Sequence, residues 1–68
     1  MLTIGQLAKK FSRSRSTLLY YDSIGLLSPS GRSGANYRLY SDNDIRTMEK
    51  ITGYRKAGLS LDAIARLL

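Results

Sequence analysis

Side chains that can bind phosphate and contact bases gather in two short segments of the chain, residues 13–20 and 32–38. Both segments combine arginine guanidinium groups with hydroxyl groups of serine, threonine or tyrosine. The N–H donors of arginine suit phosphate oxygens and the acceptor edge of guanine, and hydroxyl groups can contact either phosphates or bases. This chemistry favours a nucleic acid as the partner. The predicted contact residues are Arg13, Arg15, Ser16, Thr17, Tyr20, Arg32, Tyr37 and Arg38.

The distribution of charge supports an anionic partner. The 68 residues carry 11 basic and 5 acidic side chains, which gives a formal net charge of +6. Residues 1–40 hold six basic residues and one acid, a net +5, whereas residues 41–68 hold five basic residues and four acids, a net +1. Charge kept only for solubility has no reason to concentrate in one part of the chain. The pattern therefore indicates a face that binds a polyanion.

The sequence offers no set of residues for catalysis. It contains no cysteine and no histidine, so it lacks disulfides, thiolate nucleophiles, the usual zinc ligands and the commonest general base. Ser14 and Ser16 have no histidine to activate them, and the five acids are scattered. The SGRSG stretch lacks the lysine and the strand-to-helix context of a nucleotide-binding loop. We expect a protein that is not an enzyme and that uses no metal or other cofactor.

A helix-turn-helix is expected to carry the first segment. Ile4, Leu7 and Ala8 fall at helical spacing after Thr3, whose hydroxyl can cap a helix over about residues 4–10. After a tight turn, Ser14 can cap a second helix that runs through about residue 22. Two short helices joined in this way are typical of the motif.

The second helix should divide its side chains between core and surface. At 3.6 residues per turn, a helix that turns Leu18 inward also turns Tyr21 inward and directs Ser16 and Tyr20 outward. A helix in the major groove of DNA presents its N-terminal residues to base edges, which places residues 15–17 at the front. We expect Tyr20 to face outward, where it can contact phosphate or a base, and Tyr21 to pack in the core.

A β-hairpin, or wing, is expected to carry the second segment. Residues 28–36, SPSGRSGAN, have the composition of a loop, and residues 37–40, YRLY, alternate as a short strand does. In this arrangement Arg32, Tyr37 and Arg38 flank the duplex and contact phosphate or the minor groove.

The remaining residues predict two more helices. Ser41, with Asp44 three residues later, forms a capping box for a helix that runs to about Lys56 and ends at Gly58. Ser60 can cap a fourth helix. The expected apolar faces are Ile45, Met48, Ile51 and Thr52 in the third helix and Leu61, Ile64, Ala65 and Leu68 in the fourth.

The expected fold is mostly α, a winged helix-turn-helix with four short helices and a two-stranded β-hairpin wing between the second and third helices. One domain, residues 1–68, is too small to enclose a large substrate cavity. The fourth helix is barely two turns long where the chain stops, so we expect a fragment. No apolar run approaches the ~20 residues of a membrane span and no signal peptide is visible, which favours a cytoplasmic protein without membrane contact.

Four stretches in this order, TIGQLAKKF, TLLYYDSIGLL, NYRLYSDNDI and GLSLDAIARLL, carry a family resemblance. They resemble the first helix, the recognition helix, the wing strand with the start of the third helix, and the fourth helix of the DNA-binding domain of MerR-family transcriptional regulators. The resemblance implies a homodimer that binds a pseudo-palindromic promoter operator and distorts the DNA so that RNA polymerase can engage it. It also implies that the dimerisation helix and the effector domain lie beyond these residues.

The chain departs from the family's pattern at positions that would contact the bases of DNA. The family usually carries arginine at the positions held here by Ser16 and Leu19, and commonly an apolar residue at the position of Arg15. We therefore expect an atypical operator sequence. Asn36 replaces the family's glycine before the wing tyrosine, and asparagine tolerates the left-handed backbone that such a turn needs.

Two other functions stay open at this point. The chain could be an excisionase-like architectural protein that bends DNA for recombination, or its basic face could dock an acidic protein. Some residues are assigned plainer roles: Tyr40 is expected to pack, Lys9 and Lys10 to be solvated, and Arg55 and Lys56 to stabilise the end of a helix.

Overall fold

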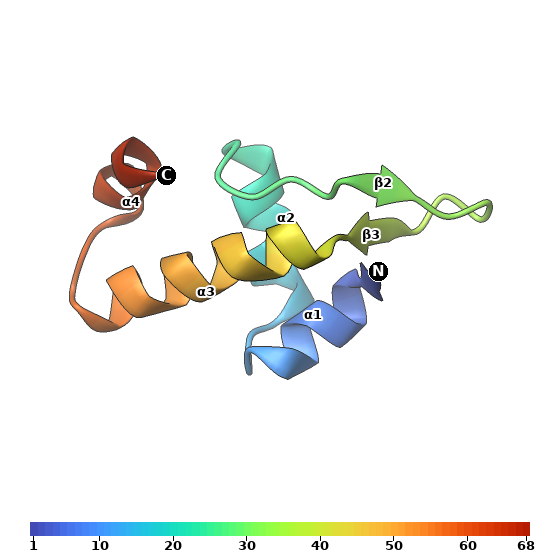
Figure 1. Cartoon of the computed structure of the whole chain (residues 1–68), viewed down its shortest axis with the longest axis horizontal. Coiled ribbons are helices and arrows are strands. Elements are labelled where there is room, and N and C mark those ends of the chain that lie inside the picture. The colour runs from blue at the N-terminus through green and yellow to red at the C-terminus, as the bar shows by residue number, and fades with distance from the viewer.

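The computed structural model describes all residues from 1 to 68 and shows four helices and three short strands (Figure 1). Helices α1 and α2 form the helix-turn-helix, the β2–β3 hairpin extends from one end of the molecule, and α4 lies at the opposite end (Figure 1). This confirms the winged helix-turn-helix. The elements are β1 (Leu2–Thr3), α1 (Ile4–Lys10), α2 (Arg15–Ser23), β2 (Gly31–Arg32), β3 (Arg38–Tyr40), α3 (Asp42–Lys56) and α4 (Leu61–Leu67).

Each helix begins at the hydroxyl residue that was predicted to cap it. The side-chain oxygens of Thr3, Ser14, Ser41 and Ser60 each accept a hydrogen bond from the backbone N–H three residues later. Such a cap contributes about 1 kcal/mol to stability. The caps fix where the helices start, and in α2 this decides which side chains stand at its N-terminal end.

Residues with left-handed backbone end the helices and shape the wing. Gly58 (φ 90°) follows α3, and Asn36 (φ 65°) precedes the wing tyrosine, both as expected. Ser12 (φ 54°) was not expected in this region. The Ser12 N–H donates to the carbonyl of Lys9 at 3.3 Å, which closes α1 and turns the chain toward α2.

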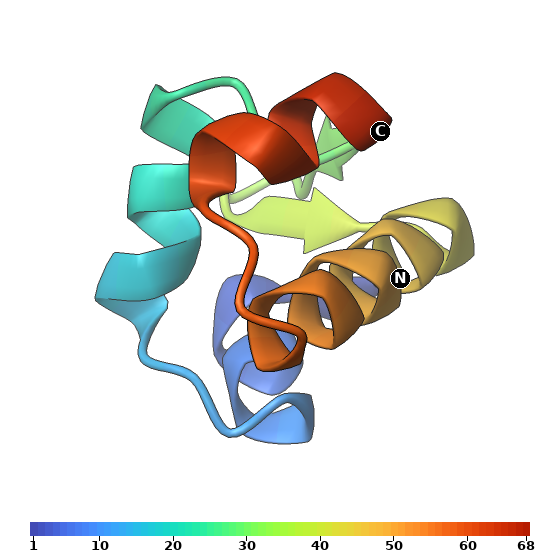
Figure 2. The same cartoon turned by 90° about the vertical axis from the view of Figure 1, so that its left-hand side faces the viewer.

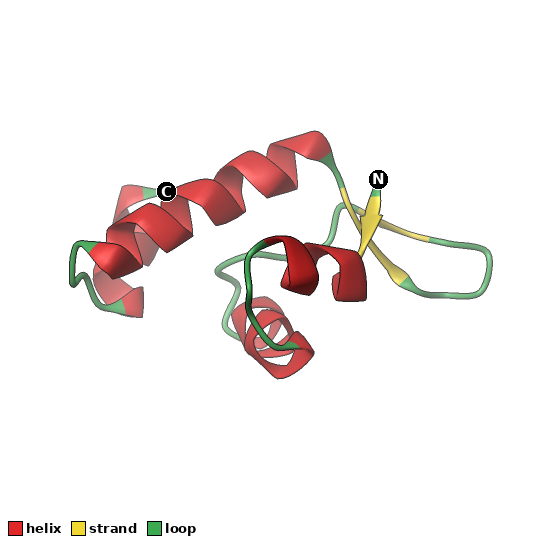
Figure 3. Ribbon diagram, turned by 90° about the horizontal axis from the view of Figure 1, so that it is seen from below, coloured by secondary structure: helices red, strands yellow, loops and turns green.

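Strand β1 was not predicted. It adds a third strand to the expected hairpin, so that the wing is part of an antiparallel sheet in the order β1-β3-β2. Leu2 pairs with Tyr40 and Thr3 with Leu39, which brings the N-terminus beside the base of the hairpin (Figure 3). Two residues are too few to show the alternation by which a strand is predicted. They form a strand only because they pair with the edge of β3 that β2 leaves free.

The core lies between α1, α2, α3 and β3, and α4 packs on α3 across one end of the molecule (Figure 2). Tyr21 and Tyr40 are buried, as predicted. Ala65 and Leu68 are exposed, so their assignment to the inner face of α4 was wrong. This short helix enters the core through Ile64, and the partly buried Leu61 packs against it. The fully buried side chains are Leu7, Leu18, Tyr40, Met48, Ile51 and Ile64.

A buried carboxylate joins the start of the wing to the start of α3. Oδ2 of Asp44 accepts hydrogen bonds from the backbone N–H of Ser30 at 3.2 Å, from the Ser30 hydroxyl, and from the backbone N–H of Ser41 at 2.8 Å. Burial acts to raise the pKa of Asp44, but the hydrogen bonds from Ser30 and Ser41 outweigh burial and hold the pKa below its ordinary value. Asp44 is therefore ionised in the folded protein at neutral pH.

We predict that Asp44→Asn lowers the free energy of unfolding by about 1–3 kcal/mol at neutral pH, because the donors of Ser30 and Ser41 lose a charged acceptor that is itself buried. A carboxyl group whose pKa is lowered on folding stabilises the protein above its unfolded pKa, and this contribution is lost as the pH falls through the folded pKa. The difference between wild type and variant, measured by urea unfolding, should therefore shrink as the pH falls below about 4, the ordinary pKa of an aspartate.

Asp42→Asn is the matched control for this prediction. Asp42 lies in the same first turn of α3 but is exposed, so the substitution should cost less than about 1 kcal/mol. A difference between wild type and Asp44→Asn that does not shrink as the solution is acidified would contradict the assigned role of the carboxylate.

Candidate nucleic-acid interface

Helix α2 divides its side chains between core and surface as predicted. Leu18 and Tyr21 are buried in the core. Ser16 is exposed, as are Leu19 by 41% and Tyr20 by 54%. The side of α2 that faces away from the protein is therefore free to contact a partner.

Hydroxyl groups hold the N-terminal end of α2. The Thr17 N–H donates to Oγ of Ser14 at 3.1 Å, and the hydroxyl oxygens of Ser14 and Thr17 lie 3.0 Å apart. Thr17 is half-buried, so its hydroxyl helps to fix the first turn of the helix. Arg13 is exposed in the turn that precedes α2 and forms no ion pair.

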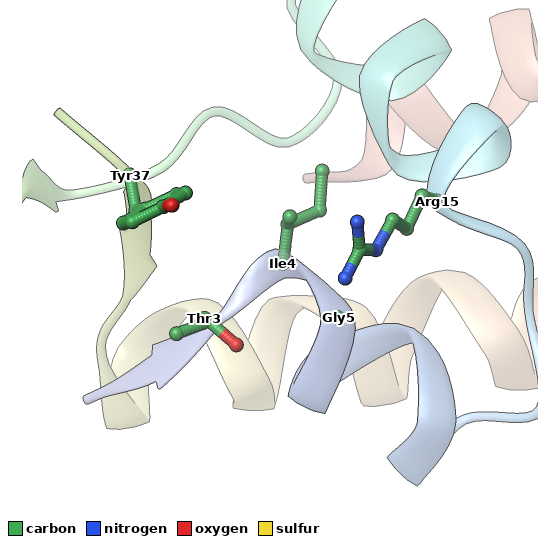
Figure 4. A pocket seen from close by; sticks show the side chains of 5 residues that line it. All are labelled: Thr3, Ile4, Gly5, Arg15 and Tyr37. Carbon is green, nitrogen blue, oxygen red and sulfur yellow. The ribbon is translucent and has the colours of Figure 1, made fainter. Parts of the chain in front are cut away.

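Arg15 lies over the first turn of α1. A Cβ added at Gly5 would stand 2.9 Å from Nη2 of Arg15 and 3.3 Å from Nε, so the guanidinium occupies space that only glycine leaves open. Thr3, Ile4, Gly5, Arg15 and Tyr37 line an open hollow of about 380 Å³ (Figure 4). Arg15 belongs to α2, and Tyr37 precedes β3 in the wing. The hollow thus brings together the two segments that the sequence predicted to contact a partner.

Ser33 closes the tip of the wing. Its backbone N–H donates to the carbonyl of Tyr37 at 2.9 Å, and its hydroxyl accepts from the Tyr37 N–H at 3.1 Å. Nη1 of Arg32 lies 3.5 Å from the carbonyl oxygen of Asn36, a long contact that leaves the side chain exposed. Tyr37 is 67% exposed. Arg32 and Tyr37 therefore lie on the surface of the wing, where their predicted contacts require them.

Arg38 is not a free surface cation, which the sequence did not indicate. Its Nε lies 3.4 Å from Oδ2 of Asp22, and the two side chains are 33% and 25% exposed. This ion pair joins the central strand of the sheet to the C-terminal end of α2. A partly exposed pair of this kind contributes less than about 1 kcal/mol, so a phosphate group can compete for the guanidinium.

Two arginines face each other across the wing. Arg32 and Arg38 are directly opposite partners on β2 and β3, and like charges in such a position repel. The carboxylate of Asp22 offsets one of these charges. An anion bound at the wing would offset the other, so the pairing favours a polyanionic partner.

Several residues had been expected to play no part in binding a partner. Tyr40 is fully buried; burial raises the pKa of its hydroxyl, whose oxygen has no hydrogen-bond partner. Nη1 of Arg55 donates to the carbonyl of Leu59 at 3.0 Å, which confirms a stabilising role after α3. Lys9 and Lys10 are exposed in the last turn of α1.

The sequence did not indicate that the start of α1 borders the candidate interface. Thr3 and Gly5 meet Arg15 and Tyr37 only through the folding of the chain, and no local signal marks such a meeting. None of the helices is long and apolar enough to cross a membrane. The structure also contains no group of three or more acidic side chains that could hold a metal ion.

Comparison with known proteins identifies the family. Residues 2–68 match the family described as MerR HTH family regulatory protein. The chain belongs to the MerR family. This MerR-family chain is 43% identical over 67 residues to an HTH-type transcriptional regulator of Pseudomonas aeruginosa, a match that covers 98% of this chain and 51% of that relative.

Two solved structures share the fold of this MerR-family domain. The N-terminus of MtaN, the multidrug transporter activator of Bacillus subtilis, aligns with a TM-score of 0.94 at 38% identity, over 97% of this chain and 62% of that chain. HiNmlR, a MerR-family regulator lacking the sensor domain and bound to promoter DNA, aligns with a TM-score of 0.82 at 32% identity, over 96% and 52%. The chain therefore spans about half the length of the relative from Pseudomonas aeruginosa and less than two thirds of both solved chains.

We predict that Gly5→Ala displaces the Arg15 guanidinium without unfolding the domain. The new Cβ meets only the end of a flexible side chain, and alanine is the better helix former by up to about 1 kcal/mol. The free energy of unfolding should stay equal or rise, while duplex affinity, measured by fluorescence anisotropy, should fall toward that of Arg15→Ala.

Gly53→Ala in α3 is the control, because a Cβ there meets no atom within 4 Å. It should leave duplex affinity unchanged. If Gly5→Ala binds as well as wild type while Arg15→Ala is impaired, the position of the guanidinium over α1 has no part in binding.

Proposed function

We propose that this domain binds double-stranded promoter DNA, with α2 in the major groove and the wing against the sugar-phosphate backbone. The observation that carries the proposal is the hollow between α2 and the wing, which Arg15 and Tyr37 line together. A helix fits the major groove, where Arg15 at the start of α2 can reach base edges, and the hydroxyl of Tyr37 on the wing suits the adjacent phosphates. The shared fold with HiNmlR, which was solved on promoter DNA, supports the proposal.

The predicted contact residues divide into two groups by their positions. Side chains at the turn and on the wing suit phosphates, which fix the position of the protein, whereas side chains on the front of α2 suit base edges, which determine sequence preference. The half-buried Thr17 contributes through the first turn of α2. We assign phosphate contacts to Arg13, Arg32, Tyr37 and Arg38, and base contacts to Arg15, Ser16 and Tyr20.

For the whole protein, we infer a transcriptional regulator without enzymatic activity that acts in the cytoplasm. The inferred form is a homodimer on a pseudo-palindromic operator, which distorts the promoter so that RNA polymerase can engage it. Residues 1–68 are then the DNA-binding domain, and the dimerisation and effector regions lie outside them. The relative from Pseudomonas aeruginosa, about half of which this chain covers, supports this division.

Selection of duplexes from a random pool tests the proposal. The chain, and a longer parent that carries the dimerisation region, would each be used at near-physiological salt, and binding of the selected duplexes would be repeated at higher salt. We expect the chain to enrich a defined half-site and the parent to enrich a two-fold palindrome. Affinity should fall steeply with salt because binding displaces counterions from DNA.

The other outcomes distinguish the alternatives. Duplex binding without enrichment of any sequence would favour an architectural protein that bends DNA. Failure of both proteins to bind, or weak binding that salt does not change, would favour a module that docks an acidic protein.

We predict that Arg38→Ala weakens binding to all duplexes alike and lowers the slope of log affinity against log salt concentration by about one, because one phosphate contact is lost. Arg66→Ala is the control, since Arg66 lies in the last turn of α4, at the end of the molecule opposite the wing. An unchanged slope for Arg38→Ala would indicate that Arg38 serves only to hold the wing against Asp22.

A further inference from the structure

The outward face of α2 is formed by uncharged side chains, with Arg15 at its edge. Ser16, Leu19, Tyr20 and Ser23 are all exposed, and at 3.6 residues per turn they cover the side of the helix opposite Leu18. The Ser23 hydroxyl donates to the carbonyl of Tyr20 at 2.7 Å and is thereby occupied within the helix. Leu19 is the only aliphatic side chain of the four, and 41% of it is exposed.

Leu19 is not part of a larger apolar surface on this helix. Its neighbours are Arg15 and Ser16 one turn before, and Asp22 and Ser23 one turn after. The exposed Ile24 is five positions further along the chain, which turns it about 140° around the helix axis from Leu19. A protein-docking site presents a contiguous apolar patch, which a leucine surrounded by polar and charged side chains does not provide. The surface suits a partner with one small apolar group among polar groups.

The major groove of DNA contains one group of this kind. The C5-methyl of thymine is the apolar group that base-pair edges present there, beside hydrogen-bond donors and acceptors. Guanine is most often read by paired donors of arginine or lysine, and on α2 only Arg15 can supply them. Arg15 stands at the edge of that face, over Gly5.

We infer that Leu19 packs on the C5-methyl group of a thymine and thereby selects an A·T pair at one position of each bound site. The inference rests on the proposed function, because it requires α2 to lie in the major groove. The Ser16 hydroxyl, one turn earlier, forms no hydrogen bond within the protein and is free to contact the edge of a neighbouring base.

The test replaces thymine by uracil, one position at a time, in the duplex that selection yields for this chain. Uracil keeps every hydrogen-bonding group of thymine and lacks only the methyl, so each replacement isolates the apolar contact. At one position, uracil should weaken binding by about fourfold, which corresponds to the loss of one buried methyl-sized group. Replacement at other positions should change affinity much less.

Variants at position 19 assign the effect to its side chain. Leu19→Ala should bind the thymine duplex at least about fourfold more weakly than wild type does. The variant should have the same affinity for the uracil duplex as for the thymine duplex. Leu19→Met, which keeps an apolar side chain of similar volume, should retain the preference for thymine. Because Leu19 is exposed, both variants should unfold at the same urea concentration as wild type.

Each result decides the inference. A preference for thymine at one position that Leu19→Ala abolishes and Leu19→Met retains supports it. Sequence-selective binding without a uracil effect at any position overturns it, as does a uracil effect that persists in Leu19→Ala, and both results leave the proposed function intact. If wild type shows no sequence-selective binding, the proposed function itself fails and the role of Leu19 fails with it.

Discussion

The pairing of β3 with both β1 and β2 fixes where the wing stands relative to α2. Tyr40 at the end of this strand is fully buried in the core, and Arg38 is paired with Asp22 of α2. Ser41, the next residue, caps α3 and donates its backbone N–H to Asp44. A strand of three residues thus connects the sheet, the helix-turn-helix and the long helix. Because the wing has no core of its own, these anchors must hold its orientation.

Helix α2 separates the residues that hold the fold from those that face outward. Its cap at Ser14 and its buried side chains Leu18 and Tyr21 fix the axis and the rotation of the helix. The outward face can therefore vary without cost to the core. In this chain that face is neutral, and the nearby positive charges lie at the turn before α2, at its first residue and on the wing. This arrangement suits a protein in which the cations of the turn and the wing supply salt-dependent affinity, while the outward face of α2, with Arg15 at its edge, supplies sequence preference.

The parts of the fold that could be predicted depend on interactions between residues no more than four positions apart in the sequence. A hydroxyl residue before an apolar repeat marks a helix start, because its oxygen satisfies an N–H three positions later, and all four caps follow this rule. Asn36 was assigned a left-handed backbone because its side chain tolerates that conformation. The helical repeat also separated the exposed Tyr20 from the buried Tyr21. Ser12 was missed because serine has no comparable preference for the left-handed region.

The sequence by itself determined the four helices, the loop of the wing, the concentration of positive charge and the resemblance to the family that the comparisons confirmed. Only the tertiary structure decided which distant groups meet. Residues 2–3 are a strand because β3 offers them an edge, Arg15 rests on Gly5, and Arg38 pairs with Asp22, 16 positions away. These contacts depend on the path of the chain between elements and on how the elements dock. Local propensity carries no information about either, so the shape of the candidate interface could be known only from the folded molecule.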